Sequence, residues 1–206
     1  MLLVRLEEML TNSRHFINGD FIRMYNGVIT RGKGDPDWFD TSWEYNIIIL
    51  EGRCIIHTLK GSYPLVKNDQ LFLSGGRCRF EPNDVFTFLL IQFPGVYRFV
   101  DRQIEIPSVY HLHEHNYLTD FKLNSIYVDI CFMIGKDICN NTILANKELV
   151  IRCVSGQGSI TTISEKAALS SGDLVYLKDE KYVINAQNDA VFQLMRAPGV
   201  NFISYQ

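Results

Sequence analysis

The sequence predicts an all-β protein made of two tandem copies of one small barrel, with a short helix in front. Short runs of β-branched and aromatic residues alternate with turns rich in Gly, Asn and Asp along most of the 206 residues. The pattern also repeats at a constant spacing, which indicates a duplicated unit. Many short strands without interleaved helices are typical of barrels and sandwiches.

The chain begins with MLLVRLEEMLTNS, in which apolar residues stand at helical spacing. We expect a short amphipathic helix within residues 1 to 15. Charged residues interrupt the apolar stretch, which argues against a secretory signal peptide. The residues expected to face inward are Leu2, Leu3, Leu6 and Leu10.

A shift of 104 positions lays a second copy of the sequence under the first without a gap. Several turn residues match at this one offset, which chance rarely produces. We therefore expect a first barrel over residues 16 to 100, a linker over 101 to 119, and a second, degenerate barrel over 120 to 206. The matched positions include Glu44 with Glu148, Gly52 with Gly156, Asp69 with Asp173, Phe88 with Phe192, and Pro94-Gly95 with Pro198-Gly199.

Both copies have the same order of strands and turns. The pieces YNIIIL and ELVIRCV predict strands buried on most of their surface. Glycine in EG and SGQG allows the positive φ of a tight turn. KND and SGD predict the next turn, QLFL and LVYL the returning strands, and VFTFLLIQF and AVFQLMRA the closing strands.

Composition excludes several classes of function. The formal net charge is -3 and no Lys/Arg run occurs, so we expect no nucleic-acid partner. No apolar run approaches the roughly 18 residues of a membrane span, so we expect no membrane partner. The five cysteines lack CxxC spacing, which argues against a zinc ribbon or a disulfide framework. We expect a cytoplasmic protein.

The stretch from IIILEG to the ND turn, with LFLSGG and FLLIQFPG after it, resembles the cupin superfamily. The first copy is more narrowly similar to the sugar-sensing N-terminal domain of AraC-class transcription regulators. The resemblance covers the core of both copies, about half of the chain. It implies a bicupin, two tandem double-stranded β-helix (jelly-roll) barrels. Because cupins host many unrelated activities, it implies little about function.

Typical metal-binding cupins carry an HxH motif, a Glu before the first Gly turn, and a further His after the second turn. By resemblance, these positions are residues 38 to 41, Tyr45 and Arg79 in the first copy, and residues 141 to 144, Leu149 and Val183 in the second. No standard ligand stands at any of them, and the permanent charge of Arg79 disfavours a cation. We expect no metal and no cofactor.

The linker contains HLHEH, with His111, His113 and His115 at alternating positions. In an extended chain all three imidazoles would face one side, as a metal or proton-handling site requires. The alternatives are a solvated linker, a metal site and a pH-sensitive contact. The position in a linker favours the first.

Tyr45 and Arg79 are expected to point into the first barrel. A buried guanidinium needs a partner, and a ligand carboxylate, phosphate or sugar hydroxyl would serve. The alternative is an internal ion pair of Arg79 with Glu44 or Glu81, or a place at the rim.

Three further residues of the first copy are candidates for ligand contact. Trp38 and Trp43 are able to stack on a sugar ring, although aromatic residues before a barrel strand are often core. His57 lies mid-strand in CIIHTL, where a satisfied core or surface histidine is the alternative. The second copy is expected to serve packing, with an interior lined by Leu149, Ile151, Cys153 and Val183.

These observations favour a metal-free bicupin that binds a small polar ligand, such as a sugar or sugar acid, or a protein partner, in a sensory or regulatory role. AraC-class sensors continue into a helix-turn-helix module, which this sequence lacks, so we do not expect direct DNA regulation. The alternative is a metal-independent cupin enzyme, such as a sugar epimerase, isomerase or lyase. That mechanism needs a base with a pKa near neutrality, for which His57 or His15 would have to serve.

We also expect a homodimer. Strand edges that remain unpaired are usually covered, and a two-fold axis covers them economically. The expected interface lies within residues 1 to 15 or 101 to 110.

Overall fold

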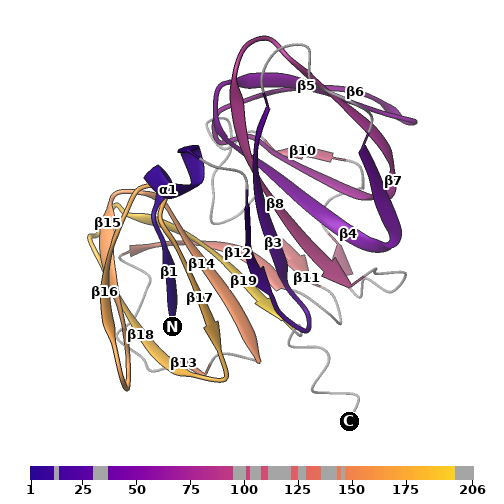
Figure 1. The fold of residues 1–206 in the computed structure, drawn as a ribbon. Coiled ribbons are helices and arrows are strands. Elements are labelled where there is room, and N and C mark those ends of the chain that lie inside the picture. Colours follow the sequence, from indigo (N-terminus) through magenta and orange to yellow (C-terminus); the bar gives the residue numbers. More distant parts are fainter. Residues whose placement is uncertain are drawn as a thin grey trace. The chain divides into compact units, whose positions relative to one another are not determined.

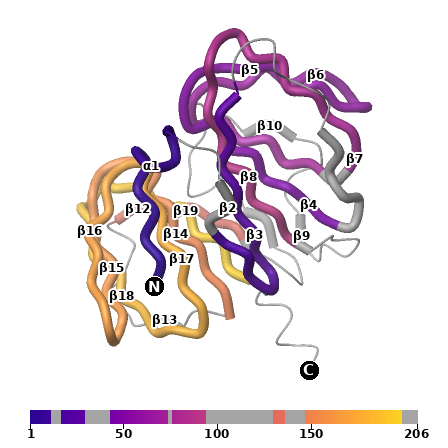
Figure 2. Tube along the Cα trace, viewed as in Figure 1, coloured from indigo at the N-terminus to yellow at the C-terminus, as the bar shows by residue number. Residues whose placement is uncertain are grey.

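A computed structural model describes residues 1–11, 14–29, 37–94, 101–102, 108–110, 122–124, 129–135, 143–144 and 147–197 (Figure 1). Figure 2 follows the Cα trace in the same view. Within these residues nearly all secondary structure is β-strand, and the one helix is α1 (Leu6–Thr11) (Figure 1). The all-β prediction is confirmed. The chain divides into two compact units, each built around one barrel.

The first barrel belongs to a unit formed by Glu7–Tyr97 and Ile104–His115. Its strands follow the order β2-β3-β8-β4-β7-β5-β6, and β10 pairs with β7. Neighbouring strands are antiparallel. The strands are β2 (Arg14–Asn18), β3 (Arg23–Ile29), β4 (Asp37–Glu51), β5 (Arg53–Thr58), β6 (Gly61–Val66), β7 (Gln70–Pro82), β8 (Phe86–Pro94) and β10 (Ser108–Tyr110).

The second barrel belongs to a unit formed by Met1–Leu6, Arg98–Gln103 and Asn116–Gln206. It has two sheets, with the orders β1-β17-β14-β19-β12-β11-β9 and β13-β18-β15-β16. The strands are β1 (Leu2–Val4), β9 (Asp101–Arg102), β11 (Lys122–Asn124), β12 (Asp129–Ile134), β13 (Ile143–Leu144), β14 (Glu148–Ser155), β15 (Gln157–Thr162), β16 (Lys166–Ser170), β17 (Leu174–Lys178), β18 (Lys181–Ala186) and β19 (Val191–Ala197).

The expected N-terminal helix is shorter than predicted. Residues 2 to 4 form β1, which pairs antiparallel with β17 of the second barrel (Figure 1). The helical spacing of the leucines did not distinguish these alternatives, because three residues are too few to show a period. The linker segments are also used within the chain, since β9 pairs with β11 and β10 with β7. Residues 2 to 4 and 101 to 102 thus pair within the chain, which weakens the argument for a dimer, and the dimer stays a prediction.

The strand registers reproduce the repeat seen in the sequence. In the first barrel Ile47 lies opposite Leu71 and Leu90. In the second barrel Ile151 lies opposite Val175 and Leu194, each 104 positions later. Two independent pairings at one offset mean that the two barrels share one strand architecture.

The predicted turns are also duplicated. Gly52 and Gly156 have φ values of 81° and 78°. The next turn contains Asn68 with φ of 72° in the first barrel and Gly172 with φ of 91° in the second. The predicted positive φ at the glycine turns is confirmed, and a short-chain Asn accepts the left-handed region where the first copy lacks Gly.

One aspartate closes each of these second turns. Asp69 Oδ2 accepts the backbone N–H of Val66 at 2.9 Å, and Asp173 Oδ2 accepts that of Ser170 at 3.0 Å. Both side chains are buried. A carboxylate that accepts a turn N–H fixes the turn and therefore the register of the strands on either side.

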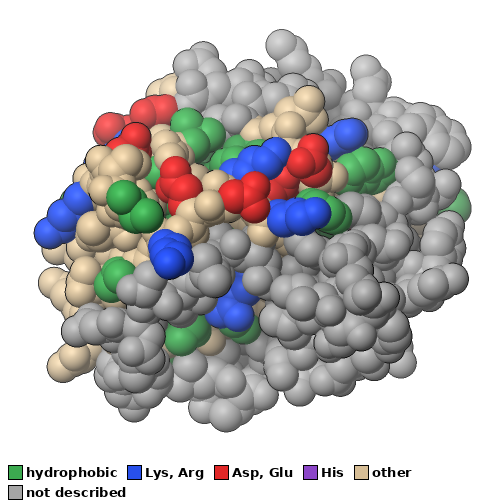
Figure 3. Space-filling view, turned by 90° about the horizontal axis from the view of Figure 1, so that it is seen from below, with side chains coloured by type: hydrophobic (Ala, Val, Ile, Leu, Met, Phe, Trp, Pro, Cys, Tyr) green, Lys and Arg blue, Asp and Glu red, His purple; other side chains and the backbone are tan. Residues whose placement is uncertain are grey.

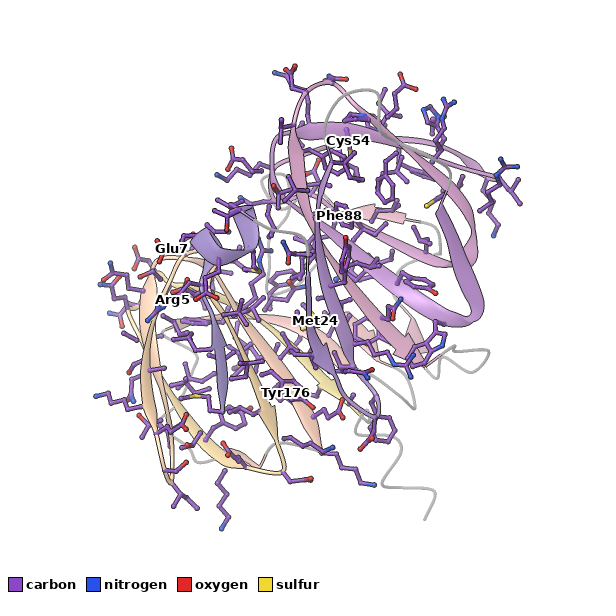
Figure 4. All side chains as sticks on the ribbon, viewed as in Figure 1. Arg5, Glu7, Met24, Cys54, Phe88 and Tyr176 are labelled. Atoms are coloured by element: carbon purple, nitrogen blue, oxygen red, sulfur yellow. The ribbon has the colours of Figure 1, made fainter. Side chains whose placement is uncertain are left out.

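Asp173 also binds the N-terminal segment. Its Oδ2 accepts Arg5 Nη1 at 2.6 Å, and its Oδ1 accepts the backbone N–H of Leu6 at 3.1 Å. Arg5 Nη1 also donates to the Ala168 carbonyl at 2.9 Å, and Figure 4 shows Arg5 at the end of β1. The same carboxylate therefore closes a turn and holds β1 on the second barrel.

Charged side chains of both signs are intermixed on the face drawn in Figure 3, as expected from the interspersed sequence. In the described part of the chain, no helix has the length and hydropathy needed to span a membrane.

Asp173→Asn is expected to lower the free energy of unfolding by about 1 to 3 kcal/mol, because an amide has one acceptor oxygen for three donors and no charge for Arg5. Urea denaturation measures the loss, and hydrogen exchange follows the amides of residues 2 to 4. These amides are expected to exchange faster. Asp69→Asn is the matched control: it weakens the corresponding turn and should leave exchange at residues 2 to 4 unchanged. Equal exchange in both variants would contradict the binding of the N-terminal segment by Asp173.

Candidate functional site

One row of side chains crosses four neighbouring strands of the first barrel. Arg23 of β3 lies opposite Gln92 of β8, and Gln92 lies opposite Tyr45 of β4. Tyr45 in turn lies opposite Leu73 of β7. Trp43 stands two residues before Tyr45 on the same face of β4. We call Arg23, Trp43, Tyr45 and Gln92 the polar end of the first barrel.

This end belongs to the barrel interior. Tyr45 and Leu73 are part of the buried core, with 2% and 4% of their surface exposed, and Trp43 packs against that core. Tyr45 was predicted to face the interior, and this is confirmed. Trp43 is half-buried, so part of its ring packs against the core and part remains exposed.

Arg23 is the exposed cation of this end. Its Cζ lies 4.3 Å from the centroid of the Trp43 ring, a cation–π arrangement worth about 0.5 to 1 kcal/mol at an exposed site. Within the described residues this guanidinium makes no ion pair, and the Gln92 amide makes no side-chain hydrogen bond. The indole therefore helps to hold the guanidinium at the polar end, and its N–H donors make no ion pair within the described residues.

The interior beyond this end is filled by aromatic rings. The centroids of Phe80 and Phe88 are 5.1 Å apart, and those of Phe86 and Phe88 are 5.6 Å apart. Figure 4 shows Phe88 inside the barrel, and a Cβ on Gly27 would clash with its ring. Phe88 lies two rows from Tyr45, since it pairs with Ile49. The middle of the barrel is therefore packed, whereas the polar end includes the exposed Arg23.

The prediction that Arg79 points into the barrel is wrong. Its neighbours Cys78 and Phe80 are in the core, and the Arg79 side chain is 56% exposed. Its Nη2 lies 3.2 Å from Glu81 Oε2, which is the internal ion pair left open as the alternative. A shift of one residue along a strand turns a side chain to the opposite face.

The same one-residue error occurs in the second barrel. Leu149, Ile151 and Cys153 line the interior as predicted. Val183 does not, because its neighbours Tyr182 and Ile184 are the residues in the core.

His57 also lies on the outer face, opposite Arg79. Its Nδ1 lies 2.8 Å from Ser62 Oγ, and its Nε2 lies 2.8 Å from Glu81 Oε2. Hydrolase triads use the two ring nitrogens the other way round and add donors for the oxyanion. Here the three side chains stand across adjacent strands in contact with water, so they serve as a surface cross-strand contact.

The remaining predicted residues are less fully described. Trp38 lies in β4 with its backbone opposite Arg77, and its side chain lies outside the described residues, as does that of His15. His111, His113 and His115 also lie outside them. Ligand contact by Trp38 and metal binding by HLHEH stay predictions.

Groups suited to a metal ion do not gather in the described residues, where no set of three His, Cys, Asp or Glu side chains meets. Burial raises the pKa of the Cys54 thiol to about 12. It raises that of Cys153 to about 11, with help from the nearby Asp173 charge. Both cysteines are therefore thiols at neutral pH, whereas a metal ligand must be a thiolate.

Sequence reasoning missed Arg23 and Gln92. Gln92 was visible as one polar residue inside the apolar run FLLIQF, and its repeat mate Arg196 interrupts FQLMRA at the matching position. Arg23 shares its strand face with Tyr25, which packs on the core, but the facing of that strand is not evident before its register is known.

Protein purified without a His-tag is expected to contain far less than one equivalent of Fe, Mn, Ni, Cu or Zn by elemental analysis, because neither cupin ligand set is present. Stoichiometric metal that disappears when His111, His113 and His115 are replaced by Ala would contradict this and identify the linker as a metal site.

No family model and no curated protein sequence matches this chain. Solved structures do. A cupin 2 conserved barrel domain protein from Leptotrichia buccalis matches with a TM-score of 0.73 at 11% identity, over 95% of this chain and 96% of that one. A salicylate 1,2-dioxygenase from Pseudaminobacter salicylatoxidans matches with 0.68 at 7% identity, over 96% and 83%. An oxalate decarboxylase matches with 0.57 at 10% identity, over 93% and 76%. The chain therefore has the cupin fold, in the two-barrel form of the bicupins.

Proposed function

We propose that this chain is a binding protein without catalytic activity, and that its first barrel holds a small organic carboxylate at the polar end. The observation that carries the proposal is the exposed Arg23 guanidinium, oriented on Trp43 beside the Gln92 amide. A planar guanidinium matches the two oxygens of a carboxylate. The half-buried indole offers an apolar surface for the body of the ligand, which in a sugar acid is the sugar ring.

Carboxylates are the first class to test for a second reason. Two of the fold neighbours are named for reactions of salicylate and of oxalate. The polar end retains the position at which cupins carry their Glu ligand, but here Tyr45 occupies it. A chain that binds a carboxylate without a metal ion would serve a sensory or regulatory role.

The enzyme alternative needs an acid–base group inside a barrel. His57 was the in-repeat candidate, and it lies on the outer face with Ser62 and Glu81. No other observation on the described residues favours an epimerase, isomerase or lyase, so we propose binding.

Isothermal titration calorimetry of the full chain tests the proposal with gluconate, glucuronate, salicylate and oxalate, each beside a neutral analogue such as glucose or salicyl alcohol. At least one carboxylate is expected to bind and its neutral analogue to bind much more weakly. Arg23→Gln is expected to weaken that binding about 10- to 100-fold, since hydrogen bonds to charged groups are worth about 1.5 to 3 kcal/mol.

Arg79→Gln is the matched control, because it removes the same charge from the outer face of the same barrel. It should leave binding unchanged. Equal losses in the two variants, or equal binding of the neutral analogue, would contradict the proposal. Conversion of the bound ligand to a product, followed by NMR, would favour the enzyme alternative instead.

A further inference from the structure

The second barrel has an apolar interior with polar side chains gathered at one end. Arg196 of β19 lies opposite Leu149 of β14, in the row that corresponds to Gln92 and Tyr45 in the first barrel. Tyr182 of β18 enters the same core from the other sheet. We call Tyr182 and Arg196 the polar end of the second barrel.

The Tyr182 hydroxyl is buried without a partner. The residue is 1% exposed, and no hydrogen-bond partner for its hydroxyl stands within the described part of the chain. Burial raises the pKa of Tyr182, and the nearby Arg196 charge opposes that rise. The guanidinium is thus close to the hydroxyl, although the two groups do not complete a hydrogen bond of acceptable geometry.

Arg196 points into the same interior. It shares a face of β19 with Phe192 and Leu194, both core residues. Its side chain is only partly buried, and its Nε has no partner among the described residues. The polar end of the second barrel therefore combines a partly exposed guanidinium, Arg196, with a buried hydroxyl donor, Tyr182.

We propose that Tyr182 and Arg196 bind a small oxyanion at the polar end of the second barrel. The hydroxyl donates one hydrogen bond to an anion oxygen, and the guanidinium supplies the compensating charge and further donors. An apolar surrounding strengthens both contacts, because there is little water to compete for the anion. The site is independent of Arg23 and of the function proposed for the first barrel.

The first barrel has no such pair. Its residues at the corresponding positions are Cys78 and Gln92, so neither a tyrosine hydroxyl nor a guanidinium stands there. On β12, the backbone of Asp129 lies directly opposite Arg196 in register. Cys131, also on β12, lies near the Tyr182 hydroxyl.

NMR of the full chain labelled with 13Cζ-tyrosine tests the site directly. The Tyr182 resonance is identified as the one missing from Tyr182→Phe, and the Tyr45 resonance from Tyr45→Phe. Acetate, oxalate and inorganic phosphate are titrated at constant ionic strength against chloride. At least one probe is expected to move the Tyr182 resonance in a saturable way, and the probes that act distinguish a carboxylate ligand from phosphate.

Arg196→Gln installs the residue that the first barrel carries at this position. It is expected to weaken the titration seen at Tyr182 about 10-fold or more. Arg23→Gln should leave that titration unchanged, even if the first barrel binds nothing. Without any probe, Tyr182→Phe should keep the melting temperature of the parent chain or raise it, because it removes an unpaired buried hydroxyl.

Any one of four results would overturn the proposal. The Tyr182 resonance stays still with every probe, or it moves equally with chloride alone. Alternatively, Arg196→Gln titrates as the parent chain does. A clear loss of stability in Tyr182→Phe without probe would also overturn it, since the hydroxyl would then have a structural partner.

Discussion

A buried aspartate that closes one short turn sets the geometry on which both barrels depend. Asp69 accepts the Val66 N–H and Asp173 the Ser170 N–H, and a residue with positive φ precedes each aspartate. The backbone carbonyl of each aspartate also accepts the N–H of Ile49 or Cys153. The turn therefore ties the returning strand to the long central strand of its own barrel. Because side chains alternate along a strand, this tie decides which residues of β7 and β17 face the interior.

The rows that follow from this register place different chemistry at the same position in the two copies. In the first barrel the row ends in Gln92 and the exposed Arg23, which Trp43 orients from the neighbouring strand. In the second barrel the equivalent of Gln92 is Arg196, and the fully buried Tyr182 enters the same interior from the other sheet. The duplicated frame is thus retained while the polar groups have diverged. A cation at the end of each interior is compatible with anions rather than with a metal ion.

The sequence was sufficient to predict the repeat, the glycine turns and the all-β fold, because these depend on local backbone preferences and on apolar periodicity. It failed where one residue decides the outcome. Arg79 and Val183 were placed inside because turn positions are known from sequence only to within a residue, and the neighbours Cys78 and Tyr182 occupy the interior instead. Residues 2 to 4 were expected to be helical, but a free strand edge on β17 and the Asp173 carboxylate determine their conformation. Neither long-range partner can be identified from the local sequence.

The most direct measurement of the central claim is a crystal structure of the full chain grown with the carboxylate that binds most tightly. We expect a carboxylate whose oxygens lie about 2.7 to 3.2 Å from the Arg23 guanidinium, with the body of the ligand against Trp43. A metal ion bound inside the first barrel near Tyr45, or a ligand held only on the outer face beside Arg79 and His57, would contradict it.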